Sequence, residues 1–381
     1  MKRLISILLI IILSFNYVLV YGDDNFTAKS YLLMDYNSGK IILANNEHDK
    51  LPPASITKIM TLLIAMEYID NGTINLDDRV IVSESASKAI GTSVYLDAGE
   101  VQTVENLLKA ISIRSANDAS IALAVHIAGS EEAFVDLMNE RASQLGMENT
   151  HFNNSNGLPV NNHYTSAYDI ALMSRELMKY ESIVPYLTTW MEDLEVGKQK
   201  KSVQTMVNTN RLIKDYEGAN GIKTGSTSEA KYCISASAKR GDLQLIAVIM
   251  GADSSSLRFS EAQRLLDNGF SNYESVTIGK EGEVVANILV EKGKLDVLPI
   301  VLERDSHILL TKSRDNKIEK DLIYPETIKA PIDKGQIIGE LVVKLDGDEI
   351  ERVNLMAKSE VAKASYARIL KNVWNNFLFN K

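Results

Sequence analysis

The sequence predicts an α+β protein in which an antiparallel sheet packs against helices, followed by a small β-rich domain and a terminal amphipathic helix. Three observations predict this class. Strand-like runs near residues 31–44 and 232–251 enclose a long helical stretch. Short β-like runs follow after about residue 277, and an apolar stripe at helical spacing ends the chain. We therefore expect the first and last strands of the larger domain to share one sheet.

Residues 1–22 are typical of an export signal. Lys2 and Arg3 precede an apolar core from Leu4 to Leu13, and Gly22 fits a cleavage site. An uncleaved membrane anchor is the alternative, because the apolar stretch continues almost to Val20. Both readings predict that the rest of the chain lies outside the cytoplasm.

Residues 23–275 form the larger predicted domain. The runs "YLLMD" and "KIILA" flank the turn "YNSG" and predict a hairpin over 31–44. Amphipathic helices are expected from about 101 to 190. Strands are expected at 232–238 and 243–251, joined by the turn "KRGD", and the run "SLRFSEAQRLLDNGF" predicts a closing helix.

Residues 276–356 read as a β-rich domain without a catalytic constellation, and residues 359–381 as one amphipathic helix. The apolar face of that helix is Tyr366, Ile369, Leu370, Val373, Trp374, Phe377 and Leu378. The opposite face is cationic, and no acidic residue occurs from 361 onward. Such a helix suits an anionic membrane surface, here the outer face of the cytoplasmic membrane. Packing of the stripe on the β domain is the alternative.

Composition excludes some functions. The net charge of −9, without a long basic run, argues against a nucleic-acid partner. The single cysteine, Cys233, cannot form an intrachain disulfide and reads as a small core residue. The five histidines show no metal-binding spacing, so neither a metal nor another cofactor is expected. His163 and Asp169 are expected to organise a loop.

The stretch "LPPASITKIMTLL", residues 51–63, places Ser55 and Lys58 one helical turn apart. The two prolines suit the entry of a helix, so Ser55 is expected in its first turn. This spacing puts a nucleophile beside a possible base, near the free N–H groups of a helix N-terminus. Two further S-x-x-K tetrads, at Ser85 and Ser228, are interpreted as surface features.

Two more motifs follow in order: Ser115-Ala116-Asn117 in "ISIRSANDAS" and Lys223-Thr224-Gly225 in "GIKTGSTSEA". The order S-x-x-K, S-x-N, K-T-G is that of penicillin-interacting serine enzymes. With "GLPVNNHYTSAYDIALMSREL" and "YCISASAKRGDLQLIAVIMGAD", the chain resembles the low-molecular-mass D-alanyl-D-alanine carboxypeptidases, penicillin-binding proteins of the DacA/DacF type in serine peptidase family S11. The resemblance spans nearly the whole chain. It implies a catalytic domain with the serine β-lactamase and penicillin-binding-protein fold.

The roles of the motif residues follow from this resemblance and from their chemistry. Ser55 is the expected nucleophile, and Lys58 is its base if burial and a second cation, for which Lys223 is the candidate, keep the amine neutral. Ser115 is expected to hydrogen-bond both lysines and relay a proton, and Asn117 to hold the substrate backbone. Lys223 and Thr224 are expected to bind the terminal carboxylate. The resemblance implies an oxyanion hole of the Ser55 and Ser226 N–H groups.

The expected substrate is the peptidoglycan stem pentapeptide, with β-lactam antibiotics as covalent inhibitors of Ser55. Rapid penicillin hydrolysis is not expected, since no Leu-Asn dipeptide of the class A β-lactamase loop occurs in the chain. Two alternatives remain at the level of sequence: a D,D-endopeptidase of cross-linked peptidoglycan, and a catalytically silent wall-binding protein.

Overall fold

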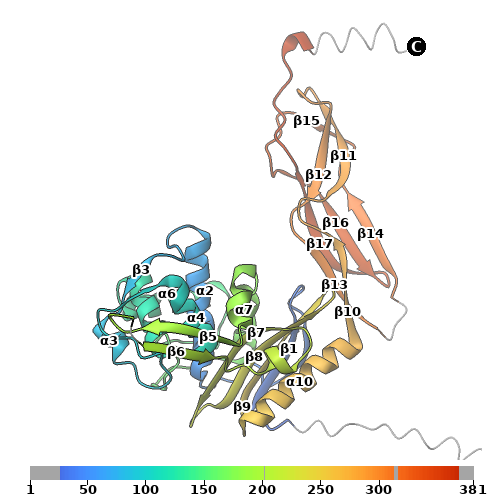
Figure 1. Ribbon diagram of the computed structural model, residues 1–381. Helices are drawn as coiled ribbons and strands as arrows, with labels where there is room; N and C mark the ends of the chain where they lie inside the picture. The colour runs from blue at the N-terminus through green and yellow to red at the C-terminus, as the bar shows by residue number, and fades with distance from the viewer. Residues whose placement is uncertain (1–25, 201, 313–315, 369–381) are drawn as a thin grey trace, which may run out of the picture.

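The computed structural model describes residues 26–200, 202–312 and 316–368. The predicted signal segment 1–22, and residues 369–381 of the predicted terminal helix, lie outside these ranges. Figure 1 shows a broad α+β part joined to an elongated β part that extends away from it.

The sheet of the α+β part has the strand order β2 (Ile41–Asn45), β1 (Ser30–Asp35), β9 (Leu243–Ala252), β8 (Lys231–Arg240) and β7 (Ala219–Thr227). Neighbouring strands are antiparallel, and β1 pairs with β9 through Tyr31 and Ile249. The prediction that the first and last strands share one sheet is therefore confirmed, and the structure shows in addition that they are direct neighbours. Every residue of β9 is buried, as expected of a central strand covered on both faces.

The two faces of the sheet have separate cores. Leu33, Leu245 and Ile249 pack against the long helix α10 (Ser255–Asn272), whereas Leu32 and Val248 face the other helices. That second face is covered by α7 (Ala167–Leu177), and α2 (Lys58–Asp70) packs against α7. Residues 58–66 of α2 are all buried, as in a helix surrounded by protein.

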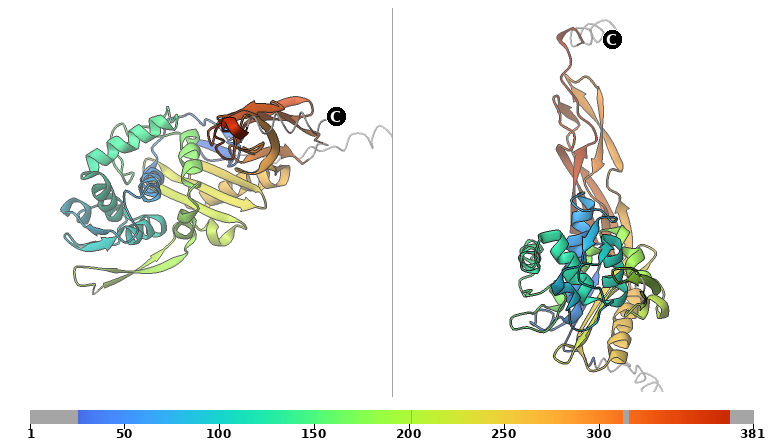
Figure 2. Two further views of the ribbon diagram at one scale, coloured as in Figure 1. Left: turned by 90° about the horizontal axis from the view of Figure 1, so that it is seen from above. Right: turned by 60° about the vertical axis from the view of Figure 1, so that its left-hand side comes forward.

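The remaining helices lie in two places: those within residues 84–144 lie beyond α2, on the side away from the β domain (Figure 2), whereas those at 184–188 and 212–215 pack against β7. They are η1 (Ala54–Thr57), α3 (Glu84–Ser87), α4 (Val104–Lys109), the π-helical turn η2 (Ala110–Arg114), α5 (Asn117–Ala128), α6 (Glu131–Gln144), η3 (Glu181–Ile183), α8 (Val184–Thr188) and α9 (Leu212–Asp215). Two strand pairs were not expected from the sequence: β3 (Arg79–Ile81) with β4 (Val101–Thr103), and the hairpin β5 (Met191–Val196) with β6 (Ser202–Val207).

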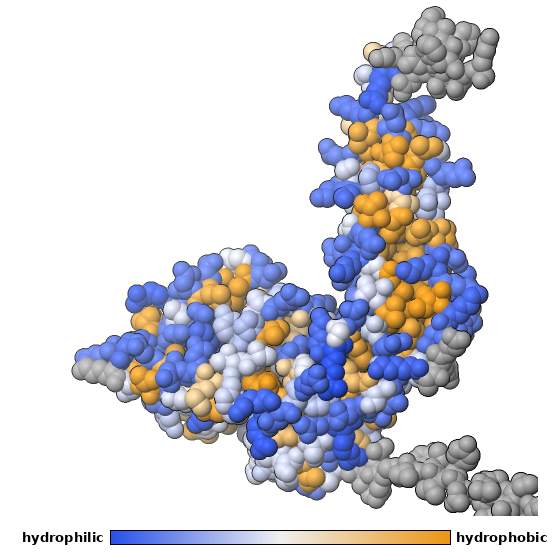
Figure 3. Space-filling view, turned by 45° about the vertical axis from the view of Figure 1, so that its right-hand side comes forward, coloured by the Kyte–Doolittle hydropathy of each residue, from blue (hydrophilic) through white to orange (hydrophobic). Residues whose placement is uncertain are grey.

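The elongated part contains a pair, β10 (Tyr273–Gly279) with β13 (Ser306–Thr311), and a six-stranded sheet. The order of that sheet is β14 (Ile318–Ile323), β16 (Ile337–Leu345), β17 (Asp348–Ala357), β12 (Val297–Leu302), β11 (Val284–Glu291) and β15 (Thr327–Lys329). It has its own core, centred on Leu298, Val343 and Leu355. Apolar residues also show on its surface in Figure 3. Leu289, Ile323 and Ile337 of this sheet are exposed. Within the described residues, no helix is long and apolar enough to cross a membrane.

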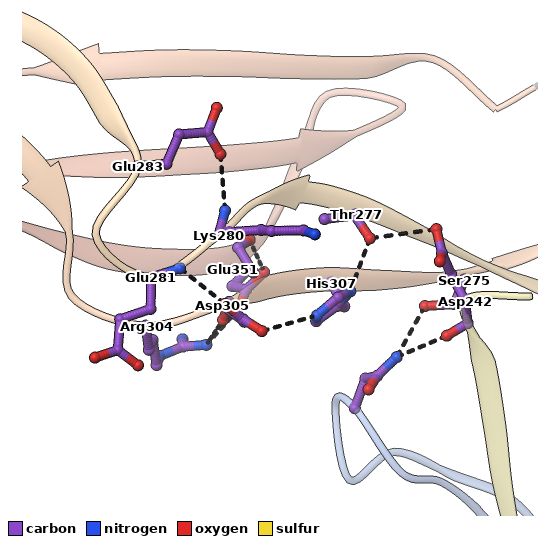
Figure 4. A network of polar contacts seen from close by, with 12 residues as sticks. Asp242, Ser275, Thr277, Lys280, Glu281, Glu283, Arg304, Asp305, His307 and Glu351 are labelled. Atoms are coloured by element: carbon purple, nitrogen blue, oxygen red, sulfur yellow. Dashed lines mark hydrogen bonds and ion pairs between the residues drawn. The ribbon is translucent and has the colours of Figure 1, made fainter. Parts of the chain in front are cut away.

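Polar contacts join the two parts (Figure 4). The Asn37 side-chain amide donates to the Asp242 carbonyl oxygen at 3.0 Å and to Ser275 Oγ at 3.3 Å. Thr277 Oγ1 lies 3.4 Å from Asp242 Oδ2 and 3.2 Å from His307 Nδ1. The loop between β8 and β9 is thereby tied to β10 and β13.

Candidate active site

Ser55 and Lys58 lie where the chain enters the buried helix α2. After Pro52 and Pro53 the chain forms the single 3₁₀ turn η1, and Lys58 is the first residue of α2. Ser55 was expected in the first turn of the α-helix. It lies instead in the 3₁₀ turn that directly precedes α2. Lys58 Nζ is 3.1 Å from Ser55 Oγ. The i, i+3 spacing thus brings amine and hydroxyl into hydrogen-bonding contact.

The Lys58 amine is enclosed by oxygen atoms. Its side chain is fully buried, and Nζ donates to Asn117 Oδ1 at 2.7 Å and to the Asn156 carbonyl oxygen at 2.6 Å. Burial, and next to it the Lys223 ammonium, hold the pKa of Lys58 well below its usual value, against an opposing effect of Asp118. The neutral amine has two N–H groups, which these two carbonyl-type oxygens satisfy. Its lone pair then faces the hydroxyl of Ser55.

Ser115 occupies a special backbone position at the end of η2. Its φ of 65° is left-handed, and its buried Oγ has no hydrogen-bond partner within the described residues. The expected hydrogen bonds from Ser115 to both lysines are therefore absent, which corrects that expectation. At Lys58 the Asn117 amide takes this place, since its Oδ1 contacts Nζ while its Nδ2 donates to the Ile90 carbonyl oxygen at 2.6 Å. Lys223 Nζ donates instead to the Thr224 carbonyl oxygen.

The K-T-G segment lies on the edge strand β7, against the turn that carries Ser55. A Cβ added to Gly225 would lie 2.9 Å from the Ser55 backbone nitrogen and 3.0 Å from the Pro53 carbonyl oxygen. Only glycine permits this close backbone approach. Ser226 follows directly and is exposed. The strand therefore runs alongside the nucleophile and presents its next residue to solvent.

Lys223 and Thr224 are both buried side chains of this strand. Lys223 is 1% exposed, and its Nζ donates to the Thr224 carbonyl oxygen at 3.1 Å. Burial, followed by the Arg258 guanidinium, lowers the pKa of Lys223 to about 7. Thr224 Oγ1 donates to Thr209 Oγ1 at 2.8 Å. The close approach of Gly225 to the Ser55 backbone nitrogen brings the first and third motifs into one site.

Sequence reasoning missed several residues that build this site. Arg258, on α10, lies against the K-T-G strand, and its Nη1 donates to the carbonyl oxygens of Gly225 at 3.3 Å and Cys233 at 3.4 Å. Asp118 accepts the N–H groups of Val94 and Leu96 and so holds the segment beside α5. A guanidinium distant in sequence carries no motif signal. Asp118 follows Asn117 directly, so its place beside a motif was the one available hint.

The other residues considered from the sequence lie outside this cluster. His163 Nε2 is 2.9 Å from Thr57 Oγ1, and its Nδ1 accepts the Asn153 N–H at 3.0 Å, so the ring fastens the 151–166 loop to η1. Asp169 accepts the Asn149 N–H at 2.8 Å in the same region. Cys233 is buried, and its burial raises the pKa of the thiol to about 11.

The two other S-x-x-K tetrads form surface ion pairs. Lys88 Nζ is 2.6 Å from Glu84 Oε1, and Lys231 Nζ is 2.5 Å from Asp253 Oδ1. Neither lysine is buried, so neither resembles the enclosed Lys58.

Comparison with known proteins matches both parts of the chain. Residues 19–254 match the family model described as Peptidase_S11, D-alanyl-D-alanine carboxypeptidase, and residues 273–363 match the penicillin-binding protein 5 C-terminal domain. The chain is 42% identical over 390 residues to D-alanyl-D-alanine carboxypeptidase DacF of Bacillus subtilis, covering 99% of this chain and 100% of that protein. It is 31% identical to D-alanyl-D-alanine carboxypeptidase DacA of Escherichia coli K12, covering 91% and 87%. The crystal structure of penicillin binding protein 5 from Haemophilus influenzae matches with a TM-score of 0.74 and 32% identity, covering 89% and 98%.

Proposed function

Because this chain belongs to the peptidase S11 family of D-alanyl-D-alanine carboxypeptidases, we propose that it removes the terminal D-alanine of peptidoglycan stem pentapeptides through an acyl-enzyme on Ser55. One observation carries the assignment: the buried Lys58 amine lies 3.1 Å from Ser55 Oγ, with its two other contacts taken by Asn117 Oδ1 and the Asn156 carbonyl oxygen. A neutral amine so held can accept only the Ser55 proton.

Acylation begins when Lys58 takes the proton from Ser55 and Oγ attacks the carbonyl carbon of the penultimate D-alanine. The N–H groups of Ser55 and Ser226 stabilise the oxyanion, a role supported by the close approach of β7 to η1 at Gly225. The C–N bond then breaks, the proton passes to the leaving amine, and free D-alanine departs. Water hydrolyses the ester and restores the Ser55 hydroxyl.

The free carboxylate of the substrate selects the exopeptidase reaction. Lys223 and the Thr224 hydroxyl bind that carboxylate, with the Arg258 guanidinium behind the strand adding positive potential. Asn117 holds the substrate backbone from the opposite side. The buried Ser115 hydroxyl, which has no partner in the described part of the chain, relays the proton to the leaving group.

The test is D-alanine release from a stem pentapeptide by the full chain and by Ser55→Ala and Lys58→Ala. We expect both variants to lose at least about a thousandfold in rate, the size typical of removing a nucleophile or its base. Mass spectrometry should place a penicillin adduct on Ser55, and an adduct on any other residue would refute the assignment. Faster cleavage of a cross-linked dimer than of the pentapeptide would favour the D,D-endopeptidase. Peptidoglycan binding without D-alanine release would favour a silent wall-binding protein.

We further propose that the protein acts outside the cytoplasm, attached to the outer face of the cytoplasmic membrane by residues 359–381. Tyr366 is 79% exposed, and the chain leaves the β part at the end far from the α+β part (Figure 1). Lys363 pairs with the turn between β11 and β12 at Gly293, beside the exposed Lys292 and Lys294. These lysines, together with the absence of acidic residues in the sequence from 361 onward, suit an anionic lipid surface.

Deletion of residues 369–381 tests the attachment and leaves the pairing of Lys363 with Gly293 intact. We expect the shortened chain to stay in the supernatant when anionic vesicles are pelleted, while the full chain sediments with them. Penicillin acylation of both chains controls for folding. If the shortened protein still sediments tightly with native membranes, the N-terminal segment is the anchor.

A further inference from the structure

A groove of about 370 Å³ lies next to the turn that carries Ser55. Three segments line it: the residues before η1, with Lys50 and Pro52; the 151–166 loop, with Asn161 and Tyr164; and the turn after β7, with Glu229. None of these residues belongs to the three sequence motifs. The groove is therefore a distinct surface that continues from the candidate active site.

The direction of the substrate leads into this groove, an inference that rests on the proposed function. The terminal carboxylate is bound at Lys223 and Thr224, and the carbonyl under attack lies between the N–H groups of Ser55 and Ser226. The rest of the stem peptide must then leave past Thr227 and toward Glu229, since β7 runs in that direction. The side chain of the third stem residue is the first long group upstream of the two D-alanines.

Two opposite charges line the groove. Lys50 and Glu229 are both exposed, and neither forms an ion pair with any described residue. Lys50 Nζ lies 4.8 Å from the centre of the Tyr164 ring, a cation–π contact that orients the ammonium without neutralising it. An ammonium and a carboxylate are therefore both free to bind a ligand at one site.

We propose that the groove is a subsite for the side chain of the third stem residue, and that it selects an end group carrying both a carboxylate and an ammonium. The carboxylate of such a group pairs with Lys50 and its ammonium pairs with Glu229. A diamino dicarboxylic acid such as meso-diaminopimelate has this end group, whereas a lysine side chain offers the ammonium alone. Asn161, on the same wall, adds uncharged hydrogen-bonding groups.

Three pentapeptides that differ only at residue three test the subsite: diaminopimelate, lysine and Nε-acetyl-lysine. The measurement is kcat/KM for D-alanine release by the full chain. We expect a preference of about threefold for diaminopimelate over lysine, the size typical of one exposed ion pair. Lys50→Met should lower kcat/KM for the diaminopimelate peptide to the value for the lysine peptide. Glu229→Gln should lower kcat/KM for the diaminopimelate and lysine peptides by about threefold relative to kcat/KM for the acetylated peptide.

Lys88→Met is the matched control, because it removes an exposed lysine from an S-x-x-K tetrad far from the groove and should leave all three ratios unchanged. Penicillin acylation shows whether each variant is folded. Release of D-alanine with the same three ratios in the full chain, Lys50→Met and Glu229→Gln would overturn the subsite alone. No release from any peptide would instead overturn the proposed function.

Discussion

The two buried lysines of the site face different demands. Lys58 must be neutral to accept a proton, whereas the ordinary pKa of a lysine amine is about 10.4. Full burial and a neighbouring ammonium both lower this pKa. Lys223 must instead carry a charge to bind a carboxylate, and its own burial beside Arg258 opposes this. The site therefore works in the pH range where one amine is neutral and the other is still protonated.

This balance predicts an upper limit of activity set by Lys223. Because its pKa is about 7 in the free protein, kcat/KM for a substrate with a free carboxylate should fall about tenfold per pH unit at higher pH. Lys223→Arg keeps the positive charge at every accessible pH. We expect this variant to be slower at pH 7 but to show a flat profile up to pH 9. An unchanged alkaline limb in Lys223→Arg would assign that limb to a different group.

The sequence predicted which motif side chains lie together in the site, and the structure shows which atoms are in contact. The tetrad spacing alone predicted the contact of Ser55 with Lys58. The Asn156 carbonyl oxygen was beyond prediction, because a backbone acceptor carries no residue-type signal. The bond of Asn117 to Lys58 was missed for a different reason: the π-helical turn η2 determines which member of Ser115-Ala116-Asn117 reaches the amine.

Among the elements, regular periodicity was a reliable guide. The hairpin at 31–44 and the strands at 232–251 were predicted, since they are apolar or alternating runs bounded by clear turn residues. The hairpin β5–β6 was missed because its strands are short and alternate charged and apolar residues. No strong turn signal between them distinguishes these strands from loops. The π-helical turn η2 was missed because nothing in "AISIR" distinguishes it from α-helix.

The packing of β7 against η1 predicts that Gly225→Ala disables the site. The added methyl group would meet three backbone atoms, of Ser55, Ile56 and Pro53, at 2.9 to 3.0 Å, and backbone cannot rotate away. We expect a stability loss of about 2 kcal/mol and an approximately hundredfold slower penicillin acylation, because the strand must shift from the nucleophile.

Gly241→Ala provides the comparison for this prediction. Apart from its two chain neighbours, no heavy atom of the described residues lies within 4 Å of the position that a Cβ would take at Gly241. Its φ of +59° makes the change a purely local strain in the β8–β9 turn. We expect a lower melting temperature with normal acylation. Equal acylation by both glycine variants would contradict the close-approach argument for Gly225.

Because His163 holds the 151–166 loop against η1, we expect the stability of this loop to decrease in acid. Burial lowers the pKa of His163 from 6.5 to about 4, so the unfolded chain binds more protons between these values. Stability contributed by the neutral ring is complete above pH 6.5 and is lost as the pH falls toward 4. The loss amounts to about 3 kcal/mol. Urea unfolding at pH 7 and pH 4 measures it.

His163→Gln should remove most of this pH dependence while destabilising the protein at pH 7, since the Asn153 N–H loses its acceptor. His48→Gln, at a largely exposed histidine, is the control and should leave the pH dependence in place. A His163→Gln protein that is still destabilised by acid to the original extent would contradict this account.

Across the whole molecule, the two parts have separate cores and meet through few contacts. Leu309 of β13 packs on the α10 side of the first core, and the polar contacts of the junction include those of Asn37, Asp242 and Thr277. Lys312 also donates from Nζ to the Phe270 carbonyl oxygen at 2.7 Å. The whole candidate site, including Arg258, lies before residue 272. The β part therefore covers some of the apolar surface on the α10 side of the catalytic sheet, but it supplies no side chain to the candidate site.

A chain of residues 26–272 should accordingly react with penicillin at nearly the rate of the full chain. We expect a stability loss of about 1–2 kcal/mol, the value of exposing the surface that Leu309 covers. Acylation kinetics and thermal unfolding of the two chains measure the two effects. A folded short chain that reacts far more slowly would show that the β part shapes the site.

The pairing of β1 with β9 has a consequence for biosynthesis. Residues 30–35 emerge among the first of the described chain, but their partner strand, 243–252, is completed only after the whole helical region has been made. Forming such a distant contact is slow, because a long loop must close first. A nascent chain released before β9 is translated lacks the strand that pairs with both β1 and β8. A stop codon just upstream of β9 therefore yields a polypeptide that contains all three motifs but cannot form the sheet that aligns them.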